Sequence, residues 1–195
     1  GRSNKFFIKS CEKIFCYSDK IKNFPNKFKD KISIIPTLLR REFYNMMKND
    51  IINKNVDLLI IGGSQGAKSF DVMVQNSIID LSKKYKIKIY QQTQQKNFVN
   101  LGLFYQANEI QYELFDFNED ISVLMNNVNI CLTRAGASTL AELVFLNIPH
   151  LVVPLPTAKD NHQFENATFY NQQGCNWILN QNEINDNNLS NKLFD

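Results

Sequence analysis

Three polar side chains could act together at the start of a helix. Ser138 and Thr139 follow Gly136, and Glu142 lies one helical turn beyond Ser138 on the same face. Hydroxyls in a first turn cap a helix or contact a ligand, and the free N–H groups there favour an anion. A carboxylate one turn further can accept hydrogen bonds from both hydroxyls of a ribose. The stretch 134–142 therefore predicts a site for a nucleotide.

A glycine-rich turn at 62–67 is a second candidate anion site. It follows the apolar run 58–61 and precedes a helical pattern, so its backbone can approach a phosphate closely. It is not a P-loop, because Ala67 precedes Lys68 and the glycine spacing is wrong. It is also a poor dinucleotide fingerprint, because no acid ends the next strand. A purely structural turn remains the alternative.

A third polar stretch, 155–163, lies between an apolar run and another helical pattern. Asp160 can cap that helix, and His162 or Gln163 would point from its first turn into the same crevice. The alternative is a first turn that only faces solvent, and His162 has no evident carboxylate partner for general-base work. Arg134 can pair with a phosphate or with a carboxylate at the sheet end, and the sequence leaves this open.

Alternating strands and helices from residue 57 onward must position these stretches. Repeated β–α units predict a doubly wound parallel α/β sheet, covered on both faces, with ligands at the carboxyl ends of the strands. Apolar runs predict strands at 58–61, 87–91, 110–114, 128–132, 151–153 and 176–179. Helices are predicted from the glycine turn to about 85, at 98–103 and 121–125, from 138 onward, at 163–170 and at 189–194.

The front of the chain has a different pattern. Short apolar runs at 6–8, 14–17 and 32–35 predict edge strands that would not close a core alone, and 38–48 is predicted to be helical. Residues 1–56 hold 13 Lys and Arg against 5 Asp and Glu, within a net charge of +3 for the chain. Such a basic segment could face nucleic acid, a phosphate-bearing substrate or an anionic membrane, although solvated lysines are the simpler interpretation.

Composition narrows the class of protein further. The chain has 195 residues, 44% hydrophobic and 21% charged, which suits one domain with an appendage. Four cysteines without a CxxC pair and only two histidines make a zinc site improbable and favour a reducing compartment. No apolar run approaches the length of a membrane span, so any membrane association is expected to be peripheral. The first residue is Gly1 rather than Met, which suggests a fragment.

Together, three motifs resemble the donor half of a family of bacterial cell-wall transferases. These enzymes add GlcNAc from UDP-GlcNAc to lipid I and so make lipid II. The motifs follow one another in the family's spacing over roughly residues 5–190, a far more specific signal than any one of them. The matching residues are Leu59–Ala67, Arg134–Leu143, and Pro154-Leu155-Pro156 with Asp160-Asn161-His162-Gln163 and Glu165-Asn166-Ala167.

The resemblance implies a GT-B fold, which has two Rossmann-like domains. Residues 1–36 would end an incomplete N-terminal acceptor domain, 37–55 would form the linker, and 56–195 would form the UDP-sugar-binding domain, truncated at its C-terminus. The family's general base lies on a Gly-rich, His-containing loop of the first domain that is not in this chain. No catalytic residue is therefore expected here, and the fragment alone is expected to be inactive.

The resemblance also implies roles for residues in the three motifs. Glu142 would bind the ribose hydroxyls of UDP-GlcNAc, and Ser64 with its neighbouring N–H groups would meet the diphosphate. Gln163, with His162, would contact the GlcNAc hydroxyls. The transfer would invert the anomeric centre and need neither a metal nor another cofactor. The pocket would also be lined by Ala137, Ser138 and Thr139.

Two further positions follow from the resemblance. Asn118 falls where the family presents backbone to the uracil, and Arg40 falls where a linker arginine approaches the phosphates. The sequence departs from the family beside Arg40, because Pro36-Thr37-Leu38-Leu39 replaces a Gly-Asn-Pro. Gln91-Gln92 likewise replaces a His-Gln at the end of a strand.

The implied partners are UDP-GlcNAc and lipid I, without nucleic acid. The implied location is the cytoplasmic face of the bacterial inner membrane, with peripheral attachment through the missing domain. One alternative is another GT-B UDP-sugar transferase, such as a diacylglycerol glycosyltransferase. A second is a non-catalytic nucleotide-binding module that recruits an enzyme. A third, nucleic-acid binding by the basic front segment, predicts a steep salt dependence.

Overall fold

The computed structural model describes residues 6–18, 21, 24–46, 55–158 and 161–194, without the side chains of 63–67, 186–187 and 194. The chain divides into two compact units, Gly1–Leu38 and Leu39–Asp195. Each unit is described by itself. The division into an acceptor-domain remnant, a linker and a donor domain stays a prediction.

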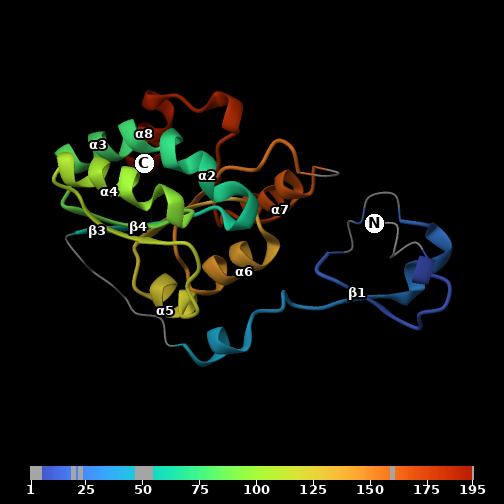
Figure 1. Ribbon diagram of the computed structural model, residues 1–195. Coiled ribbons are helices and arrows are strands. Elements are labelled where there is room, and N and C mark those ends of the chain that lie inside the picture. The colour runs from blue at the N-terminus through green and yellow to red at the C-terminus, as the bar shows by residue number, and fades with distance from the viewer. Residues whose placement is uncertain (1–5, 19–20, 22–23, 47–54, 159–160, 195) are drawn as a thin grey trace. The chain divides into compact units, whose positions relative to one another are not determined.

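The larger unit contains a parallel sheet of six strands (Figure 1), which confirms the predicted doubly wound α/β fold. The strand order is β5-β4-β3-β6-β7-β8, and every neighbouring pair is parallel. From β3 the next strands along the chain, β4 and β5, are added on one side, and from β6 the strands β7 and β8 are added on the other side. The strand order therefore reverses between β3 and β6. The strands are β3 (Val56–Ile61), β4 (Ile87–Gln92), β5 (Gln111–Phe115), β6 (Ile130–Thr133), β7 (His150–Val152) and β8 (Trp177–Ile178).

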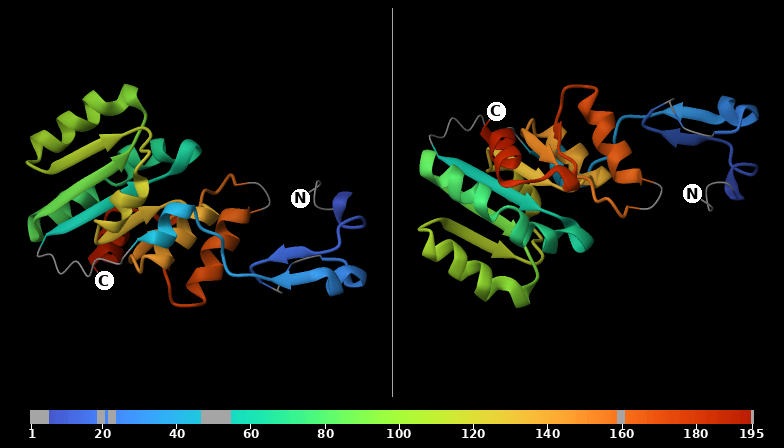
Figure 2. Two further views of the ribbon diagram at one scale, coloured as in Figure 1. Left: turned by 90° about the horizontal axis from the view of Figure 1, so that it is seen from below. Right: turned by 90° about the horizontal axis from the view of Figure 1, so that it is seen from above.

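Helices cover both faces of this sheet (Figures 1 and 2). One layer consists of α2 (Gly63–Met73), α3 (Gln75–Lys84), α4 (Phe98–Ala107) and α8 (Asp186–Phe194). The other consists of α5 (Ile121–Asn126), α6 (Ala137–Phe145) and α7 (His162–Asn171). Short 3-10 helices are η2 (Arg41–Asn45), η3 (Gln95–Asn97) and η5 (Gln181–Glu183). Among the helices that the structure describes, none has the length and apolar character needed to cross a membrane.

The central strand β3 supplies side chains to both cores. Leu58 and Ile60 belong to a cluster with residues of α2, α3, α4 and α8. Leu59 and Ile61 belong to a second cluster, with residues of α5, α6 and η2. Successive side chains of a strand point to opposite faces, and here both faces are covered. This explains why residues 58–61 of β3 are all apolar instead of alternating between apolar and polar.

Some sequence predictions are wrong in detail. The helix expected from the glycine turn to 85 is broken at Val74 into α2 and α3. The helix expected at 38–48 is only η2 within the described residues, because Phe43 is buried against the second core and Met46 returns to extended backbone. Phe6 and Phe7, predicted to begin a strand, are helical. The predicted strands of the large unit are confirmed, with ends shifted by about two residues or less.

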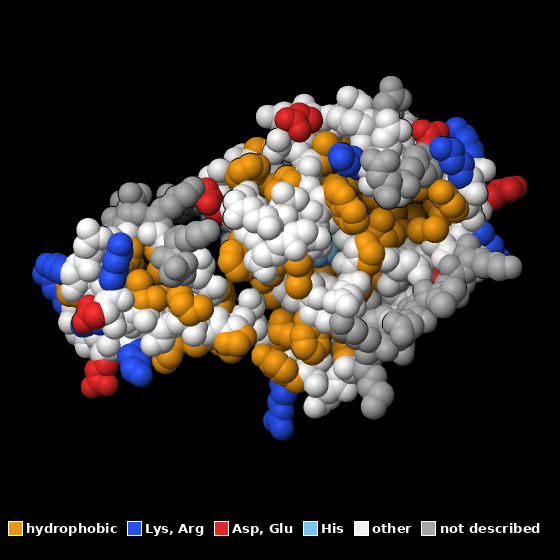
Figure 3. All heavy atoms as spheres, turned by 180° about the vertical axis from the view of Figure 1, so that it is seen from behind, with side chains coloured by type: hydrophobic (Ala, Val, Ile, Leu, Met, Phe, Trp, Pro, Cys, Tyr) orange, Lys and Arg blue, Asp and Glu red, His pale blue; other side chains and the backbone are white. Residues whose placement is uncertain are grey.

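The smaller unit is held by a short strand pair and one lysine. Strand β1 (Ile14–Cys16) pairs in parallel with β2 (Ile32–Ile34), and η1 (Asn26–Lys31) precedes β2. The Lys31 ammonium donates to the carbonyl oxygens of Cys11 at 2.6 Å and Lys9 at 3.2 Å. None of the described residues of this unit is buried, as expected for runs that do not close a core. Apolar side chains lie on its surface (Figure 3), among them Phe6, Phe7, Phe15, Tyr17 and Ile34.

His150 in β7 makes stability depend on pH. Its side chain is fully buried, and Nδ1 lies 2.7 Å from the carbonyl oxygen of Ile148. Nε2 has no hydrogen-bond partner among the described atoms. Burial lowers the pKa of His150 below its ordinary value. The folded state therefore binds this proton less readily than the unfolded state does.

We expect the free energy of unfolding to fall as the pH drops below about 6.5, the pKa of an unfolded histidine. His150→Leu should flatten that part of the pH profile, measured by urea unfolding between pH 7.5 and pH 5. His162→Leu, which removes an exposed histidine, serves as the control. Equal slopes for the wild type and His150→Leu would contradict the assignment.

Candidate functional site

A cavity of about 410 Å³ lies where the strand order reverses. Ile61 and Gly62 at the end of β3 line it together with Thr133 at the end of β6. Ligands of doubly wound sheets bind in the crevice outside the carboxyl ends of the strands, at this reversal. The cavity is therefore the candidate functional site.

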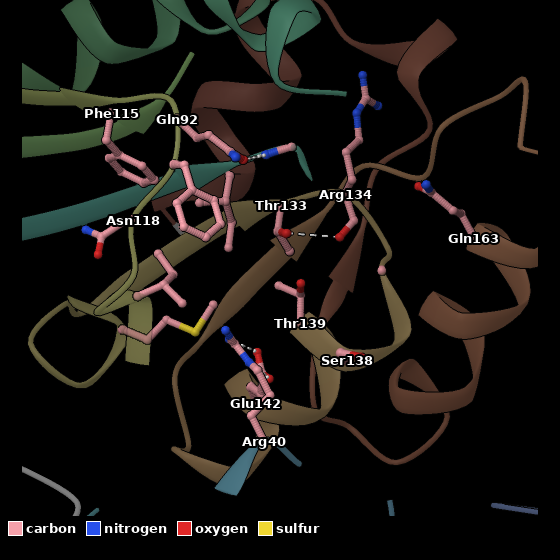
Figure 4. A pocket seen from close by; sticks show the side chains of 16 residues that line it. Arg40, Gln92, Phe115, Asn118, Thr133, Arg134, Ser138, Thr139, Glu142 and Gln163 are labelled. Atoms are coloured by element: carbon pink, nitrogen blue, oxygen red, sulfur yellow. Dashed lines mark hydrogen bonds and ion pairs between the residues drawn. The ribbon is translucent and has the colours of Figure 1, made fainter. Parts of the chain in front are cut away.

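Six of the predicted site residues line this one cavity. They come from four separate parts of the chain (Figure 4) and are Arg40, Asn118, Ser138, Thr139, Glu142 and Gln163. Two other predicted residues, Ala137 and His162, are not among the residues that line the cavity. Ala137 begins α6, and His162 is exposed at the start of α7. The backbone of Ser64 lies in the first turn of α2, and its side chain lies outside the described ones.

Glu142 and Arg40 form a two-pronged ion pair inside the cavity (Figure 4). Arg40 Nε donates to Glu142 Oε1 at 2.7 Å, and Arg40 Nη2 donates to Oε2 at 2.9 Å. The Glu142 side chain is 2% exposed, whereas that of Arg40 is 45% exposed. The hydrogen bond with Glu142 raises the pKa of Arg40. Both residues were predicted as ligand contacts, but the pair itself was not.

The N-terminus of α6 opens into the same cavity without a side-chain cap. Gly136 is the N-cap residue, and among the described side chains none makes a capping hydrogen bond to this helix. The hydroxyls of Ser138 and Thr139 therefore do not cap the helix, one of the two uses that the sequence left open. The free N–H groups and the helix dipole make this end attractive to an anion.

Gln92 secures the glycine turn to the loop that follows β5. The N–H of Gly62 donates to Gln92 Oε1 at 3.3 Å, and Gln92 Nε2 donates to the carbonyl oxygen of Asp116 at 3.1 Å. The sequence marked Gln92 only as a departure from a family pattern. Its position at the end of β4 was the available signal, because side chains there reach the cavity.

Gln163 holds two loops of the site together. Its Oε1 accepts from the N–H of Ala135 at 3.2 Å and from the N–H of Leu155 at 2.9 Å. Asn166, one turn further along α7, donates to the carbonyl oxygen of Ala135 at 3.0 Å. The loops after β6 and β7 are thereby fixed relative to each other. Asp160, the predicted cap of α7, lies outside the described residues.

Arg134 is buried and pairs with neutral oxygens. Its guanidinium donates to the carbonyl oxygen of Val153 at 3.0 Å, to Gln181 Oε1 at 2.8 Å and to Ser69 Oγ. It also lies over the ring of Phe70. Burial lowers the pKa of Arg134 to about 10. No carboxylate is among its described partners, and in Figure 4 its guanidinium points away from Glu142.

Apolar side chains form the opposite wall, which sequence reasoning did not identify. Phe115, Ile121 and Met125 line the cavity near Asn118. Phe117 does so as well, although it is 80% exposed. An exposed aromatic ring at the mouth of a cavity offers a flat stacking surface. In the part of the chain that the structure describes, no group of three or more His, Cys, Asp or Glu could hold a metal ion.

A buried carboxylate fixes α2 against the end of β4. Asp71 on α2 accepts hydrogen bonds from Gln91 Nε2 at 2.9 Å, Thr93 Oγ1 at 2.7 Å and Asn97 Nδ2 at 2.8 Å. Tyr105 extends the network by donating to Gln91 Oε1 at 2.5 Å. Burial raises the pKa of Tyr105, with the Asp71 charge as a second cause. The network positions the helix whose first turn borders the cavity.

Comparison with solved structures gives the class of this domain. MurG of Acinetobacter baumannii superimposes with a TM-score of 0.79 at 22% identity, covering 100% of this chain and 54% of that one. The larger unit is thus a Rossmann-like domain of the kind found in GT-B glycosyltransferases. Residues 57–195 match the glycosyltransferase family 28 C-terminal domain. The chain belongs to this family.

Two relatives carry the same descriptive name, UDP-N-acetylglucosamine--N-acetylmuramyl-(pentapeptide) pyrophosphoryl-undecaprenol N-acetylglucosamine transferase. The protein of Pelagibacter ubique (strain HTCC1062) is 59% identical over 194 residues, which is 100% of this chain and 54% of that protein. The protein of Rickettsia canadensis (strain McKiel) is 35% identical over 203 residues, 100% of this chain and 56% of that protein. The chain spans about half the length of these curated relatives.

Removing the Asp71 charge should loosen the helix beside the cavity. Asp71→Asn places an amide N–H₂ where three donors converge, so we expect it to lower the free energy of unfolding by about 1–3 kcal/mol. Urea unfolding would measure this, with the exposed Glu119→Gln as a control expected to change stability by less than about 0.5 kcal/mol. Equal stability of Asp71→Asn and the wild type would show that the network does not hold α2.

Proposed function

We propose that this chain is the donor-binding half of an inverting glycosyltransferase. The reaction would transfer GlcNAc from UDP-GlcNAc to lipid I to form lipid II in peptidoglycan synthesis. The observation that carries the proposal is the cavity at the sheet reversal, which contains both a buried acid and the uncapped N-terminus of α6. Family membership and the names of the relatives support the same reaction.

The acid and the helix end suit opposite ends of a uridine diphosphate. Glu142 would accept hydrogen bonds from both ribose hydroxyls, because each oxygen of a carboxylate is a hydrogen-bond acceptor. The α6 N-terminus, with Ser138 and Thr139, would face the diphosphate together with the first turn of α2 at Ser64. Ala137 would contribute backbone to the same wall.

The remaining positions suit the uracil and the sugar. The apolar wall with Phe117 would stack on the uracil, and backbone near Asn118 would face its polar edge. The side-chain oxygen of Gln163 already accepts two backbone hydrogen bonds, so Gln163 would contact the GlcNAc hydroxyls through its amide N–H₂ group. His162 lies at the start of the same helix and would approach the sugar only if it turned inward.

This chain would promote departure of the nucleotide. Charge builds on the β-phosphate as the glycosidic bond breaks, and fixed N–H groups with a nearby guanidinium would stabilise it without a metal. Deprotonation of the acceptor hydroxyl is assigned to the other domain of the whole enzyme, so no general base is proposed here. Lipid I would be met at the cytoplasmic face of the inner membrane, where the enzyme would associate peripherally.

The proposal predicts nucleotide binding that depends on Glu142. Calorimetric titration should detect binding of UDP and of UDP-GlcNAc to the chain. Addition of EDTA should leave both affinities unchanged. Glu142→Ala should weaken binding about tenfold or more, because hydrogen bonds to a charged group are lost. Glu113→Ala, which removes an exposed acid on β5, is the matched control. Absence of UDP binding to the wild type, or equal binding by Glu142→Ala, would argue against the proposal.

Donor competition separates this function from another UDP-sugar transferase. If the sugar is GlcNAc, UDP-GlcNAc should displace bound UDP at lower concentration than UDP-glucose or UDP-galactose, because only it offers the acetamido group. The measurement is competition calorimetry with all three donors. Preference for UDP-glucose or UDP-galactose would favour a transferase of the diacylglycerol type.

A further inference from the structure

The acid proposed to hold the ribose is already occupied. Both oxygens of the Glu142 carboxylate accept hydrogen bonds from Arg40, and the Glu142 side chain is almost fully covered. Both residues line the cavity. A ribose can therefore reach this carboxylate only if the Arg40 guanidinium moves aside.

The pair is built so that Arg40 moves and Glu142 stays. Glu142 lies in α6 between Ala141 and Leu143, which are both buried, so the helix cannot carry its carboxylate elsewhere. The Arg40 side chain is nearly half exposed. Its guanidinium lies over the ring of Phe43, 5.1 Å from the ring centre, and its Nε lies 3.7 Å from the half-exposed carboxylate of Glu42. Since Phe43 itself is buried, the backbone beside Arg40 stays anchored while its side chain swings.

Charge decides which ligand can displace Arg40. A nucleoside would replace the arginine with neutral hydroxyls and leave the guanidinium with the more distant, half-exposed carboxylate of Glu42 in place of its two hydrogen bonds to Glu142. A nucleoside diphosphate would do the same but also offer an anion, with which a guanidinium forms strong two-pronged hydrogen bonds. The other arginine of the cavity, Arg134, is committed to Val153 and Gln181. Arg40 is thus the available guanidinium among the described lining residues.

We propose that Arg40 is a specificity-determining residue that covers Glu142 in the empty site and transfers to the diphosphate when a nucleoside diphosphate binds. The site would then select ligands that carry a ribose and a diphosphate together. The inference rests on the proposed function and adds a competition inside the site. Arg40 opposes binding of the nucleoside part and favours binding of the phosphates.

The two effects have opposite signs in an Arg40→Gln variant. Uridine should bind about threefold more tightly, because no cation competes for Glu142. UDP should bind about tenfold more weakly, because charge-assisted hydrogen bonds to the phosphates are lost. The preference for UDP over uridine should therefore fall about thirtyfold. NMR titration of the 195-residue chain would measure uridine, calorimetry would measure UDP, and the amide spectra would verify folding.

Three further variants sharpen the test. Arg41→Gln removes the neighbouring exposed arginine and should leave both affinities unchanged. Arg40→Lys keeps the charge without the planar fork, so it should recover part of the UDP affinity. In the double variant Arg40→Gln with Glu142→Gln, the gain in uridine affinity should disappear, because that gain comes from freeing the carboxylate.

Any other outcome would overturn the proposed transfer of Arg40 from Glu142 to the diphosphate. Weaker UDP binding with unchanged uridine binding would make Arg40 a phosphate contact that does not compete for Glu142. Tighter binding of both ligands would make it a cover alone, and weaker binding of both would make the pair a structural support. A wild type that binds neither ligand would overturn the proposed function itself, and this result is distinct from the others.

Discussion

The reversal of strand order between β3 and β6 is the constraint on which the site depends. Chain segments leave these neighbouring strands toward opposite faces of the sheet, so no segment fills the space above their carboxyl ends. The glycine turn after β3 and the loop after β6 therefore begin helices that border one cavity. Most side chains discussed as ligand contacts reach this space from the first two turns of α6 and α7 or from the loop after β5, and Arg40 reaches it from just before η2.

The polar groups around this space are largely held by the protein itself. Asp71 accepts from three donors, the terminal nitrogens of Arg134 donate to neutral oxygens, and the N–H of Gly62 donates to Gln92. Buried polar groups without partners would destabilise the fold, so these contacts are needed whatever the ligand is. Among the described residues the uncapped end of α6 and the Nε of Arg134 are exceptions, and an anionic ligand is the partner that would satisfy the helix end.

The sequence predicts the framework well, because its signals are local. Apolar runs bounded by glycine and polar residues mark the strands, and Gly136 before Ser138 marks the start of α6. The motif residues that line the cavity were also identified in advance, because the ends of parallel strands meet at one edge. That expectation holds for Glu142, Thr139 and Gln163.

Features that depend on distant residues could not be predicted. The pair between Arg40 and Glu142 joins residues 102 positions apart, and no local pattern indicates it. The helix expected at 38–48 failed because burial of Phe43 overrides the local preference. The role of Arg134 was left open, since its partners Val153 and Gln181 come from other segments.

The shared acceptor of Gln163 has a thermodynamic consequence. Because one oxygen accepts from the N–H groups of Ala135 and Leu155, two loops lose their conformational entropy when the chain folds. A ligand arriving later meets a preorganised wall and does not have to order it. The loss of conformational entropy in these two loops therefore lowers the free energy of unfolding and does not weaken ligand binding.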